Sequence, residues 1–313
     1  MKTILITGGS GFLGKKLAKK LSSKFNVVLA SRNNNLNRIA NLETSCEVVP
    51  LDITSIYSIN DIFNYIKPNI VIHAAATKYV DISETNPHET IDVNILGSQN
   101  VARVAIENNI ESVIGISTDK TAPPIGNIYG LSKAVMERLF ITLNNKYKTN
   151  FSCVRFGNIA WSTGSVFPIW EEMTKKNNII HSTGPKMRRF FFTCDDASDL
   201  VIRCIKKINV TKGKILIQDM KYAQISDILT EWCKIYNIKW KEIDKRLGDK
   251  NDEYLIGDLE YKYAKSIIID NLKHFLLCFD KQIKSSLNNP VSTLNAKKLN
   301  KKEIIRLINS KNN

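Results

Sequence analysis

The chain has 313 residues, 43% of them hydrophobic, which is enough to bury a sizeable core in one or two domains. Its net charge of +15 comes from dispersed basic residues without an aromatic recognition motif, so we expect no nucleic-acid partner, although a basic cleft would suit an anionic nucleotide. No apolar run approaches the roughly 18 to 20 residues of a membrane span, and the cysteines and histidines show neither disulfide nor metal-ligand spacing. We therefore expect a cytosolic globular protein with reduced thiols, no metal and no membrane insertion.

Short apolar runs alternate with helical patterns through the first half of the chain. Helices are expected to begin near Phe12, Ser58, Pro87 and Asn127. Strands that alternate with helices predict an α/β fold of the Rossmann type, a doubly wound parallel sheet that binds ligands beyond the carboxyl ends of its strands. The expected strands cover residues 3–7, 26–31, 46–51, 69–75, 112–117 and 150–156.

A glycine-rich loop, residues 7–14, follows the first expected strand and opens the first helix. Its glycines permit a tight turn and close approach to a pyrophosphate, whose charge the helix N-terminus favours. The second strand ends in Ser31 and Arg32, and no carboxylate occurs over residues 15–42. An acid at this place would bind the ribose hydroxyls of NAD, whereas Arg32 can pair with the ribose phosphate of NADP. We predict NADP as the cofactor, and a merely solvated arginine is the alternative. The expected cofactor-binding residues here are Gly8, Ser10, Gly11, Phe12, Leu13, Gly14, Ser31 and Arg32.

The third and fourth expected strands end in further candidate cofactor contacts. Asp52 and Ile53 follow the third strand and suit contact with an adenine. Ala74, Ala75 and Ala76 follow the fourth strand, where small side chains let a cofactor pass closely. Such small residues also occur in ordinary buried strands, so their value comes from their position.

Two short motifs follow the fifth expected strand. In Tyr129-x-x-x-Lys133 the lysine shares a helical face with the tyrosine, and its charge favours the phenolate by lowering a pKa that starts near ~10. Tyr129 is therefore a candidate general base. In Ser117-Thr118-Asp119-Lys120 an acid and an amine stand side by side, so a second proton can be moved on the same substrate. One base suits a dehydrogenase, whereas an added acid and base suit a dehydratase.

The pattern changes from about Asn158 to mixed segments, with one more strand-like run over residues 214–218. This change predicts a smaller C-terminal substrate-binding domain and one return of the chain to the sheet. The basic tail is expected to form a solvated surface helix. The expected division is an NADP-binding domain over 1–160 with a returning segment at about 195–222, a substrate-binding domain over 161–194 and 223–290, and the tail over 291–313.

Together these motifs resemble the extended short-chain dehydrogenases/reductases, and more narrowly the soluble UDP-N-acetylglucosamine 4,6-dehydratases that invert carbon 5. The resemblance runs to about Ile256, and Thr118-Asp119-Lys120 is its most specific part. The glycine loop and the tyrosine-lysine pair are shared with many epimerases and reductases. Tyr129 favours the soluble inverting group, because the larger membrane-anchored, retaining relatives carry methionine there. Further matching segments are His73 to Ala76, Asn94 and residues 154–158, 164–168 and 187–190.

The resemblance implies a mechanism with internal redox chemistry. Tyr129 would take the proton of the 4-hydroxyl as hydride passes to NADP, with Lys133 stabilising the phenolate and Thr118 holding the oxygen. Lys120 would then remove the carbon 5 proton while Asp119 protonates the leaving 6-hydroxyl, and the hydride would return to carbon 6. Asp119 would have to carry a proton for this step, and Lys120 would have to be neutral.

The resemblance also implies ligands for the cofactor and a UDP-sugar. Asn94 is implied as a cofactor-binding residue. Arg189 and Arg246 are implied as ligands of the diphosphate, which arginine can bind bidentately. Three departures leave the substrate's details open: residues 121–128 are one residue longer than in the family, Gly184 stands where aspartate is usual, and Leu247 replaces a proline. The implied substrate residues are Lys78, Asn158, Ser165, Val166, Arg189, Arg246 and Glu253.

Two alternatives remain open from the sequence. A nucleotide-sugar 4-epimerase or 4-keto reductase would need Tyr129 and Lys133 but not Asp119 and Lys120. A non-catalytic NADP-binding scaffold could keep the fold, although binding alone needs no phenolate. The resemblance also implies a homo-oligomer, a dimer or a larger ring.

Overall fold

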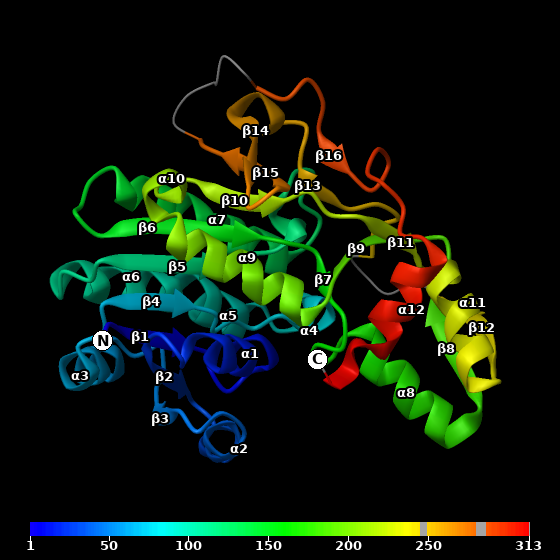
Figure 1. The fold of residues 1–313 in the computed structure, drawn as a ribbon, viewed down its shortest axis with the longest axis horizontal. Helices are drawn as coiled ribbons and strands as arrows, with labels where there is room; N and C mark the ends of the chain where they lie inside the picture. Colours follow the sequence, from blue (N-terminus) through cyan, green and yellow to red (C-terminus); the bar gives the residue numbers. More distant parts are fainter. Residues whose placement is uncertain (245–248, 280–285, 313) are drawn as a thin grey trace.

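The structure is a computed structural model that describes residues 1–244, 249–279 and 286–312. In these ranges the largest sheet has nine strands in the order β14-β15-β10-β6-β5-β4-β1-β2-β3 (Figure 1). The outer pair, β14 (Ala264–Ile269) and β15 (Leu272–Leu277), is antiparallel. The parallel strands are β1 (Thr3–Thr7), β2 (Asn26–Ser31), β3 (Glu47–Pro50), β4 (Ile70–His73), β5 (Ser112–Ile116), β6 (Asn150–Arg155) and β10 (Ile215–Gln218).

Helices cover both faces of this sheet. Helix α1 contacts α9, while α6 contacts both α3 and α7. A π-helical segment, η1 (Ile91–Leu96), joins α5 to α6, and a single 3-10 turn, η2 (Asp119–Thr121), follows β5. The helices around the sheet are α1 (Phe12–Leu21), α2 (Asn34–Thr44), α3 (Ile56–Ile66), α4 (Val80–Thr85), α5 (Pro87–Thr90), α6 (Gly97–Glu107), α7 (Ile128–Asn144), α9 (Cys194–Lys206) and α10 (Ile208–Thr211).

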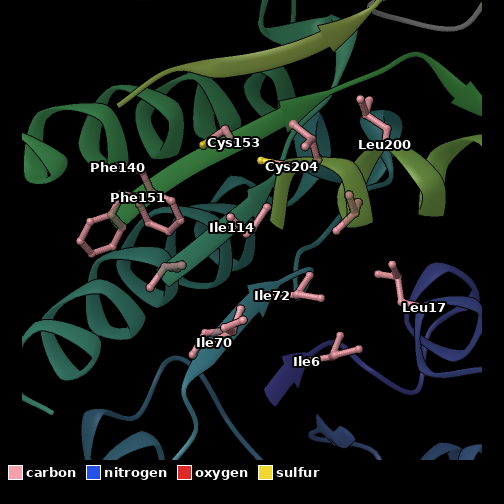
Figure 2. Packing of buried hydrophobic residues seen from close by; sticks show 14 of the residues in the cluster. Ile6, Leu17, Ile70, Ile72, Ile114, Phe140, Phe151, Cys153, Leu200 and Cys204 are labelled. Carbon is pink, nitrogen blue, oxygen red and sulfur yellow. The ribbon is translucent and has the colours of Figure 1, made fainter. Parts of the chain in front are cut away.

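The central strands β1, β4 and β5 are almost wholly buried and mostly apolar, as expected where both faces of a sheet are covered. Ile6 of β1, Ile72 of β4 and Ile114 of β5 are fully buried in one continuous core (Figure 2). Phe140 of α7 and Phe151 of β6 stack in the same core, with ring centroids 5.3 Å apart. Continuous apolar runs bounded by turns were the sequence signal for these strands, and the predicted α/β parallel-sheet fold is confirmed.

A smaller layer lies beyond the carboxyl ends of the parallel strands (Figure 1). It contains a three-stranded sheet, β7 (Asn158–Ile159), β9 (Arg188–Phe192) and β11 (Tyr222–Gln224). Two short pairs accompany it: β8 (Ile179–Thr183) with β12 (Lys239–Ile243), and β13 (Tyr254–Ile256) with β16 (Val291–Ser292). Its remaining elements are α8 (Val166–Asn177), α11 (Ile225–Tyr236), α12 (Lys301–Asn309) and η4 (Ser310–Asn312), whereas η3 (Tyr261–Tyr263) packs against the main core just before β14.

An aromatic cluster forms the core of this layer. The rings of Trp161, Phe167 and Trp232 lie within 5.7 Å of one another, centroid to centroid. Helix α12 packs onto the cluster through buried apolar side chains, and the Trp161 indole donates hydrogen bonds to the carbonyls of Leu307 and Ile308 at 3.1 and 3.0 Å. The expected solvated helix in the tail therefore has one buried face, because its apolar residues recur at helical spacing between the lysines.

The structure differs from the sequence prediction at two other elements. Helix α2 was not predicted; only Asn37 and Ala40 of it are buried, so it lacks a continuous apolar stripe. The hairpin β14-β15, expected in the second domain, instead extends the central sheet. The exact domain boundaries stay a prediction.

Candidate active site

A cleft of about 940 Å³ lies between the carboxyl edge of the sheet and the smaller layer, where ligands bind in open parallel sheets. Asp52, Asn94 and Asp119 lie outside its lining, and Arg246 lies outside the described residues. The predicted residues that line it are Gly8, Ser10, Gly11, Phe12, Leu13, Gly14, Ser31, Arg32, Ile53, Ala74, Ala75, Ala76, Lys78, Thr118, Lys120, Tyr129, Lys133, Asn158, Ser165, Val166, Arg189 and Glu253.

The glycine loop forms a cradle in which Gly8 and Gly14 have no room for a side chain. Gly8 has a φ of +69°, and a Cβ there would lie 2.7 Å from the backbone nitrogen of Ala75. A Cβ on Gly14 would collide with the backbone of Gly9. The loop therefore lies directly against the alanine run and brings the N-terminus of α1 to the cleft, which suits the pyrophosphate of a dinucleotide.

Asn37, which the sequence prediction missed, ties this cradle to strand β2. Its Oδ1 accepts hydrogen bonds from the hydroxyls of Ser10 and Ser31, the latter at 2.7 Å. Its Nδ2 donates to the backbone oxygen of Ser31 at 3.0 Å. A single buried asparagine in a helix gives little sequence signal, because its role depends on a loop that lies 27 positions earlier.

The predicted ribose end of the cradle is open and basic. The Arg32 side chain is 55% exposed, and its ion pair with Glu89 is long, at 3.7 Å. Arg32 also borders an adjoining cavity of about 440 Å³ that is lined by Asp52. Asp52 accepts hydrogen bonds from the amide and hydroxyl of Thr54 at 2.9 and 2.8 Å. Arg32 is therefore accessible to a phosphate, as the NADP prediction requires.

Asn94 lies beneath the cleft, in the π-helical segment. Its Oδ1 accepts from the Thr77 amide at 2.8 Å, and its Nδ2 donates to the Thr77 carbonyl and to the Ser132 hydroxyl, both at 2.9 Å. In the ligand-free protein Asn94 thus holds the segment after the alanine run against α7. Insertions of this π type are frequent at functional sites.

Tyr129 and Lys133 lie one turn apart on α7. Burial raises the pKa of Tyr129 and Asp119 adds to this, while Lys120 and the Thr118 hydroxyl oppose it. Burial lowers the pKa of Lys133 to about 8. The expectation that Lys133 lowers the pKa of Tyr129 is not met in this structure, because the Lys133 ammonium contacts the Met136 sulfur at 3.2 Å and burial dominates at the phenol.

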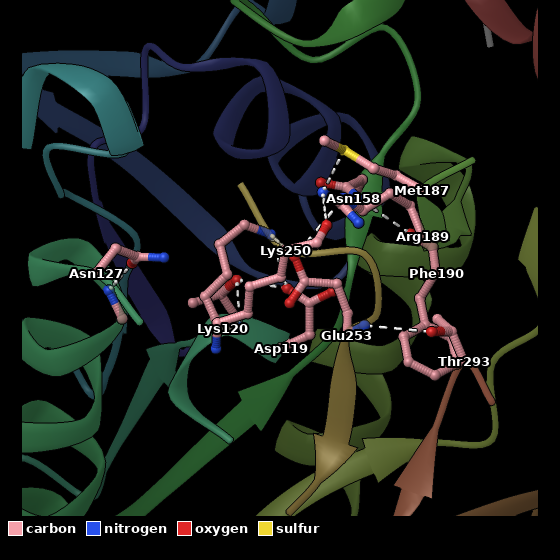
Figure 3. Close-up of polar contacts among 12 residues, drawn as sticks. Asp119, Lys120, Asn127, Asn158, Met187, Arg189, Phe190, Lys250, Glu253 and Thr293 are labelled. Atoms are coloured by element: carbon pink, nitrogen blue, oxygen red, sulfur yellow. Dashed lines mark hydrogen bonds and ion pairs between the residues drawn. The ribbon is translucent and has the colours of Figure 1, made fainter. Parts of the chain in front are cut away.

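Asp119 and Lys120 form a buried pair beside the cleft (Figure 3). The Lys120 ammonium lies 3.0 Å from Oδ1 of Asp119 and 3.8 Å from Oε1 of Glu253. Thr118 donates to the same Asp119 oxygen at 3.1 Å. The other oxygen, Oδ2, is buried without a hydrogen-bond partner among the described residues, and it lies behind Gly157, which lines the cleft. An unpartnered buried oxygen at this place could carry a proton for a bound ligand.

Lys120 differs from the sequence expectation of a neutral amine. Burial by itself lowers the pKa of Lys120, but Asp119 and Glu253 outweigh it and raise the pKa above its ordinary value. The raised pKa favours an ammonium at Lys120. The prediction missed this because Glu253 reaches the site from a segment 133 positions away.

The far end of the cleft is lined by polar groups of the smaller layer. Arg189 of β9 lies 3.6 Å from Glu253 and donates to the Lys250 carbonyl at 2.8 Å (Figure 3). Asn158 donates to the Phe190 carbonyl at 3.3 Å. Burial raises the pKa of Glu253, which faces three cations, Lys120, Arg189 and Lys250.

Two more features of this end bear on ligand binding. Ser165 precedes α8 and lines the cleft beside Val166, and its hydroxyl is buried without a partner among the described residues. Lys250, which was not predicted as a site residue, lines the same cleft and donates a hydrogen bond to the Pro124 carbonyl. Lys78 lines the cleft from the opposite, sheet side.

The part of the chain that the structure describes contains neither a cluster of metal ligands nor a membrane-spanning helix. Over these residues, no group of three or more His, Cys, Asp or Glu side chains is placed to hold a metal ion. None of the helices in the same ranges is long and apolar enough to cross a membrane.

Known proteins with similar sequences include nucleotide-sugar enzymes, a capsular polysaccharide biosynthesis protein and an uncharacterized protein. An uncharacterized membrane protein of Methanocaldococcus jannaschii is 33% identical over 98% of this chain and 95% of its own. A UDP-glucose 4-epimerase of Rickettsia bellii is 33% identical over 85% of this chain and 81% of its own. A UDP-N-acetylglucosamine 4,6-dehydratase (inverting) of Campylobacter jejuni is 30% identical over 82% of this chain and 78% of its own.

Solved structures agree in fold. The X-ray structure of Pen from Bacillus thuringiensis has a TM-score of 0.88 at 29% identity, covering 98% of this chain and 96% of that one. A dTDP-glucose 4,6-dehydratase of Streptomyces venezuelae has a TM-score of 0.71 at 16% identity, covering 80% and 86%, and shows the fold alone. The polysaccharide biosynthesis protein family matches residues 4–269. This chain therefore belongs to that family, a branch of the extended short-chain dehydrogenases/reductases that modify nucleotide sugars.

Proposed function

We propose that the protein is a 4,6-dehydratase that converts UDP-N-acetylglucosamine to a UDP-4-keto-6-deoxy-N-acetylhexosamine with inversion at carbon 5. The observation that carries this proposal is the Asp119–Lys120 pair, 3.0 Å apart, beside the cleft that also holds Tyr129 and Lys133. An epimerase needs one base for a hydroxyl, whereas elimination of water needs a second acid and base. The inverting dehydratase of Campylobacter jejuni, 30% identical, supports the choice of substrate.

The Tyr129 phenol is assigned to the 4-hydroxyl. A phenol takes up a hydroxyl proton only as the phenolate, and Lys133 is the charge that would stabilise it once the lysine turns from Met136 to the cleft, which it lines. Thr118 would hold the substrate oxygen, because its hydroxyl already interacts with Tyr129. When bound in the glycine cradle, NADP would supply the hydride acceptor and return the hydride at the end of the cycle.

Asp119 and Lys120 are assigned to the proton transfers at carbon 5 and at the 6-hydroxyl. Lys120 donates to Asp119 across a 3.0 Å hydrogen bond, so one proton must cross that bond before elimination. That single transfer makes Lys120 a neutral base and Asp119 a protonated acid, with no proton taken from solvent. Desolvation by a bound substrate favours the transfer, because burial disfavours both charged forms. Lys120 would then take the carbon 5 proton, and Asp119 would protonate the leaving 6-hydroxyl. When the hydride adds to carbon 6, carbon 5 would take a proton that has exchanged with solvent, on the face opposite the one that lost its proton.

The substrate-binding residues are proposed from the charge at the far end of the cleft. Arg189 and Lys250 supply two cations there beside Lys120, against the carboxylates of Asp119 and Glu253. The net positive charge suits a diphosphate. Asn158, Ser165, Val166 and Lys78 would contact the sugar and base.

NADP, rather than NAD, is proposed as the cofactor because Arg32 is accessible at the ribose end and no acid stands there. We expect the cytosol, since all six cysteines are free thiols.

A homo-oligomer is proposed from an apolar face on η1 and α7. Ile91, Leu96, Leu131 and Val135 are each 41–52% exposed there, and the two elements contact each other. A second copy of the chain would cover this face. Sedimentation equilibrium should give at least a dimer.

The experiment that tests the proposed reaction follows the mass of UDP-N-acetylglucosamine incubated with the purified protein. Loss of one water is expected. A product of unchanged mass would favour a 4-epimerase, which the epimerase of Rickettsia bellii keeps as the second candidate. Bound NADP without any product would favour a scaffold.

A further inference from the structure

A cluster of three buried charges lies directly beneath the acid-base pair. Arg155 of β6 is fully buried and forms two-pronged ion pairs with two glutamates. Its Nε and Nη2 donate to Glu137 of α7 at 3.0 and 2.7 Å, and its Nη1 and Nη2 donate to Glu260 at 2.8 and 2.9 Å. Both glutamates are at most 2% exposed.

Glu137 also holds the loop that carries the proposed acid and base. Its Oε1 accepts hydrogen bonds from Ser117 at 2.6 Å and from Thr121 at 3.2 Å. These two residues bracket Thr118, Asp119 and Lys120 in the sequence. Thr121 donates in addition to the Thr118 carbonyl at 2.7 Å. One carboxylate oxygen therefore fixes both ends of the triplet.

The opposite side of the cluster holds the segment of Glu253. Arg155 donates to the Leu255 carbonyl at 2.8 Å, and Glu260 accepts from the Gly257 amide at 3.0 Å. Glu253 lies two residues before Leu255 and faces Lys120 at 3.8 Å. The cluster therefore joins the two segments whose carboxylates surround the Lys120 ammonium.

Stability alone gives no reason for such a cluster, because buried ion pairs can often be replaced by apolar side chains without loss. Here all four glutamate oxygens have partners, so the network is rigid. We propose that Glu137 is a positioning residue, which sets the place of Asp119 and Lys120 through Ser117 and Thr121. The role in elimination rests on the proposed function.

Glu137 is also placed to act on Lys133, one turn earlier on α7. The titratable groups that face Lys133 are Glu137, Cys153 from β6 and His73 from β4. Cys153 and Glu137 raise the pKa of Lys133, against the lowering by burial. Arg138 faces both glutamates from the same helix. Removing the Glu137 charge should therefore lower the pKa of Lys133 below about 8.

The test compares Glu137→Gln with Glu260→Gln. Both changes remove one buried charge from Arg155. Glu137 accepts hydrogen bonds from Ser117 and Thr121, whereas Glu260 accepts from Gly257, so Glu260→Gln controls for lost stability. We expect similar falls in Tm for the two variants. Turnover should fall roughly 10- to 100-fold in Glu137→Gln beyond any fall in Glu260→Gln, since misplacement by about 1 Å costs that much. The alkaline limb of the kcat profile should move to lower pH in Glu137→Gln only.

A second readout does not depend on the reaction. Amide hydrogen exchange of a peptide spanning residues 117–122 should be faster in Glu137→Gln than in Glu260→Gln. Equal exchange, equal turnover and equal pH profiles in the two variants would overturn the positioning role. Absence of water loss by the wild type would instead reject the dehydratase proposal, and the exchange comparison would still decide the role of Glu137.

Discussion

Replacing Asp119 by asparagine should separate the two halves of the proposed reaction. Asparagine keeps the shape of the side chain and can still accept from Thr118 at the position now 3.1 Å away. It cannot protonate a leaving hydroxyl. Oxidation at carbon 4, assigned to Tyr129, should persist, so the reaction should stop before water leaves.

The size of the effect follows from the geometry of the pair. Loss of a positioned general acid costs on the order of 10² to 10⁴ in rate, which is about 3 to 5 kcal/mol in the barrier. Breaking a buried ion pair costs about 3 to 5 kcal/mol of stability. The loss of stability in Asp119→Asn should lie near the lower end of this range, because the Lys120 side chain is 17% exposed and keeps Glu253 as a partner at 3.8 Å.

The assay is a single turnover with UDP-N-acetylglucosamine in deuterated water, read by nicotinamide absorbance and product mass. Reduced cofactor should accumulate in Asp119→Asn, and deuterium should enter carbon 5 without loss of water, because Lys120 loses its nearest carboxylate and is more easily neutral. The matched control, Lys120→Met, should also accumulate reduced cofactor but incorporate no deuterium. Near-normal water loss in Asp119→Asn would refute its role as the acid.

Three further predictions test other parts of the site. Tyr129→Phe should lower turnover by on the order of 10² to 10⁴ while NADP binding by calorimetry stays near wild type, because only the phenol oxygen is lost; survival of turnover would remove Tyr129 as the base. Nucleotide released by denaturing the wild type should be NADP, and Arg32→Glu should shift the preference towards NAD; recovery of NAD alone would contradict the assignment of Arg32. Burial lowers the pKa of His73 to about 3, and Thr7 and Ser98 hold its ring at 2.9 and 3.0 Å. An unfolded histidine binds its proton below about 6.5. The unfolded state thus binds more protons between these values, and the free energy of unfolding should fall by up to about 1.4 kcal/mol per pH unit as the pH drops from about 6.5. Urea titrations at several pH values should show this slope reduced in His73→Gln, and an equal slope in both proteins would remove His73 as its source.

The elements that were predictable from sequence are those whose signal is local. Strands β1 and β2 begin and end at the expected residues, because continuous apolar runs between polar turns mark a buried parallel strand. The glycine loop was also predictable, because the spacing of its glycines within a short segment indicates a tight turn between a strand and a helix. Parallel strand ends share one edge, so the motifs that follow them were expected to meet in one cleft, as they do.

What could not be predicted depends on contacts between distant segments. The charge of Lys120 is set by Glu253, and the hydroxyls of the glycine cradle are held by Asn37 from a helix with a sparse apolar face. The cluster of Glu137, Arg155 and Glu260 joins residues up to 123 positions apart. Each of these side chains reads as an ordinary polar residue until the fold brings its partners together.

The most direct test of the central claim is the wild-type reaction with UDP-N-acetylglucosamine in deuterated water, with the product analysed by mass spectrometry and NMR. The proposed mechanism predicts a product that has lost one water, carries one solvent deuterium at carbon 5 and is inverted there. A product of unchanged mass, epimerised at carbon 4 and free of deuterium at carbon 5, would contradict it.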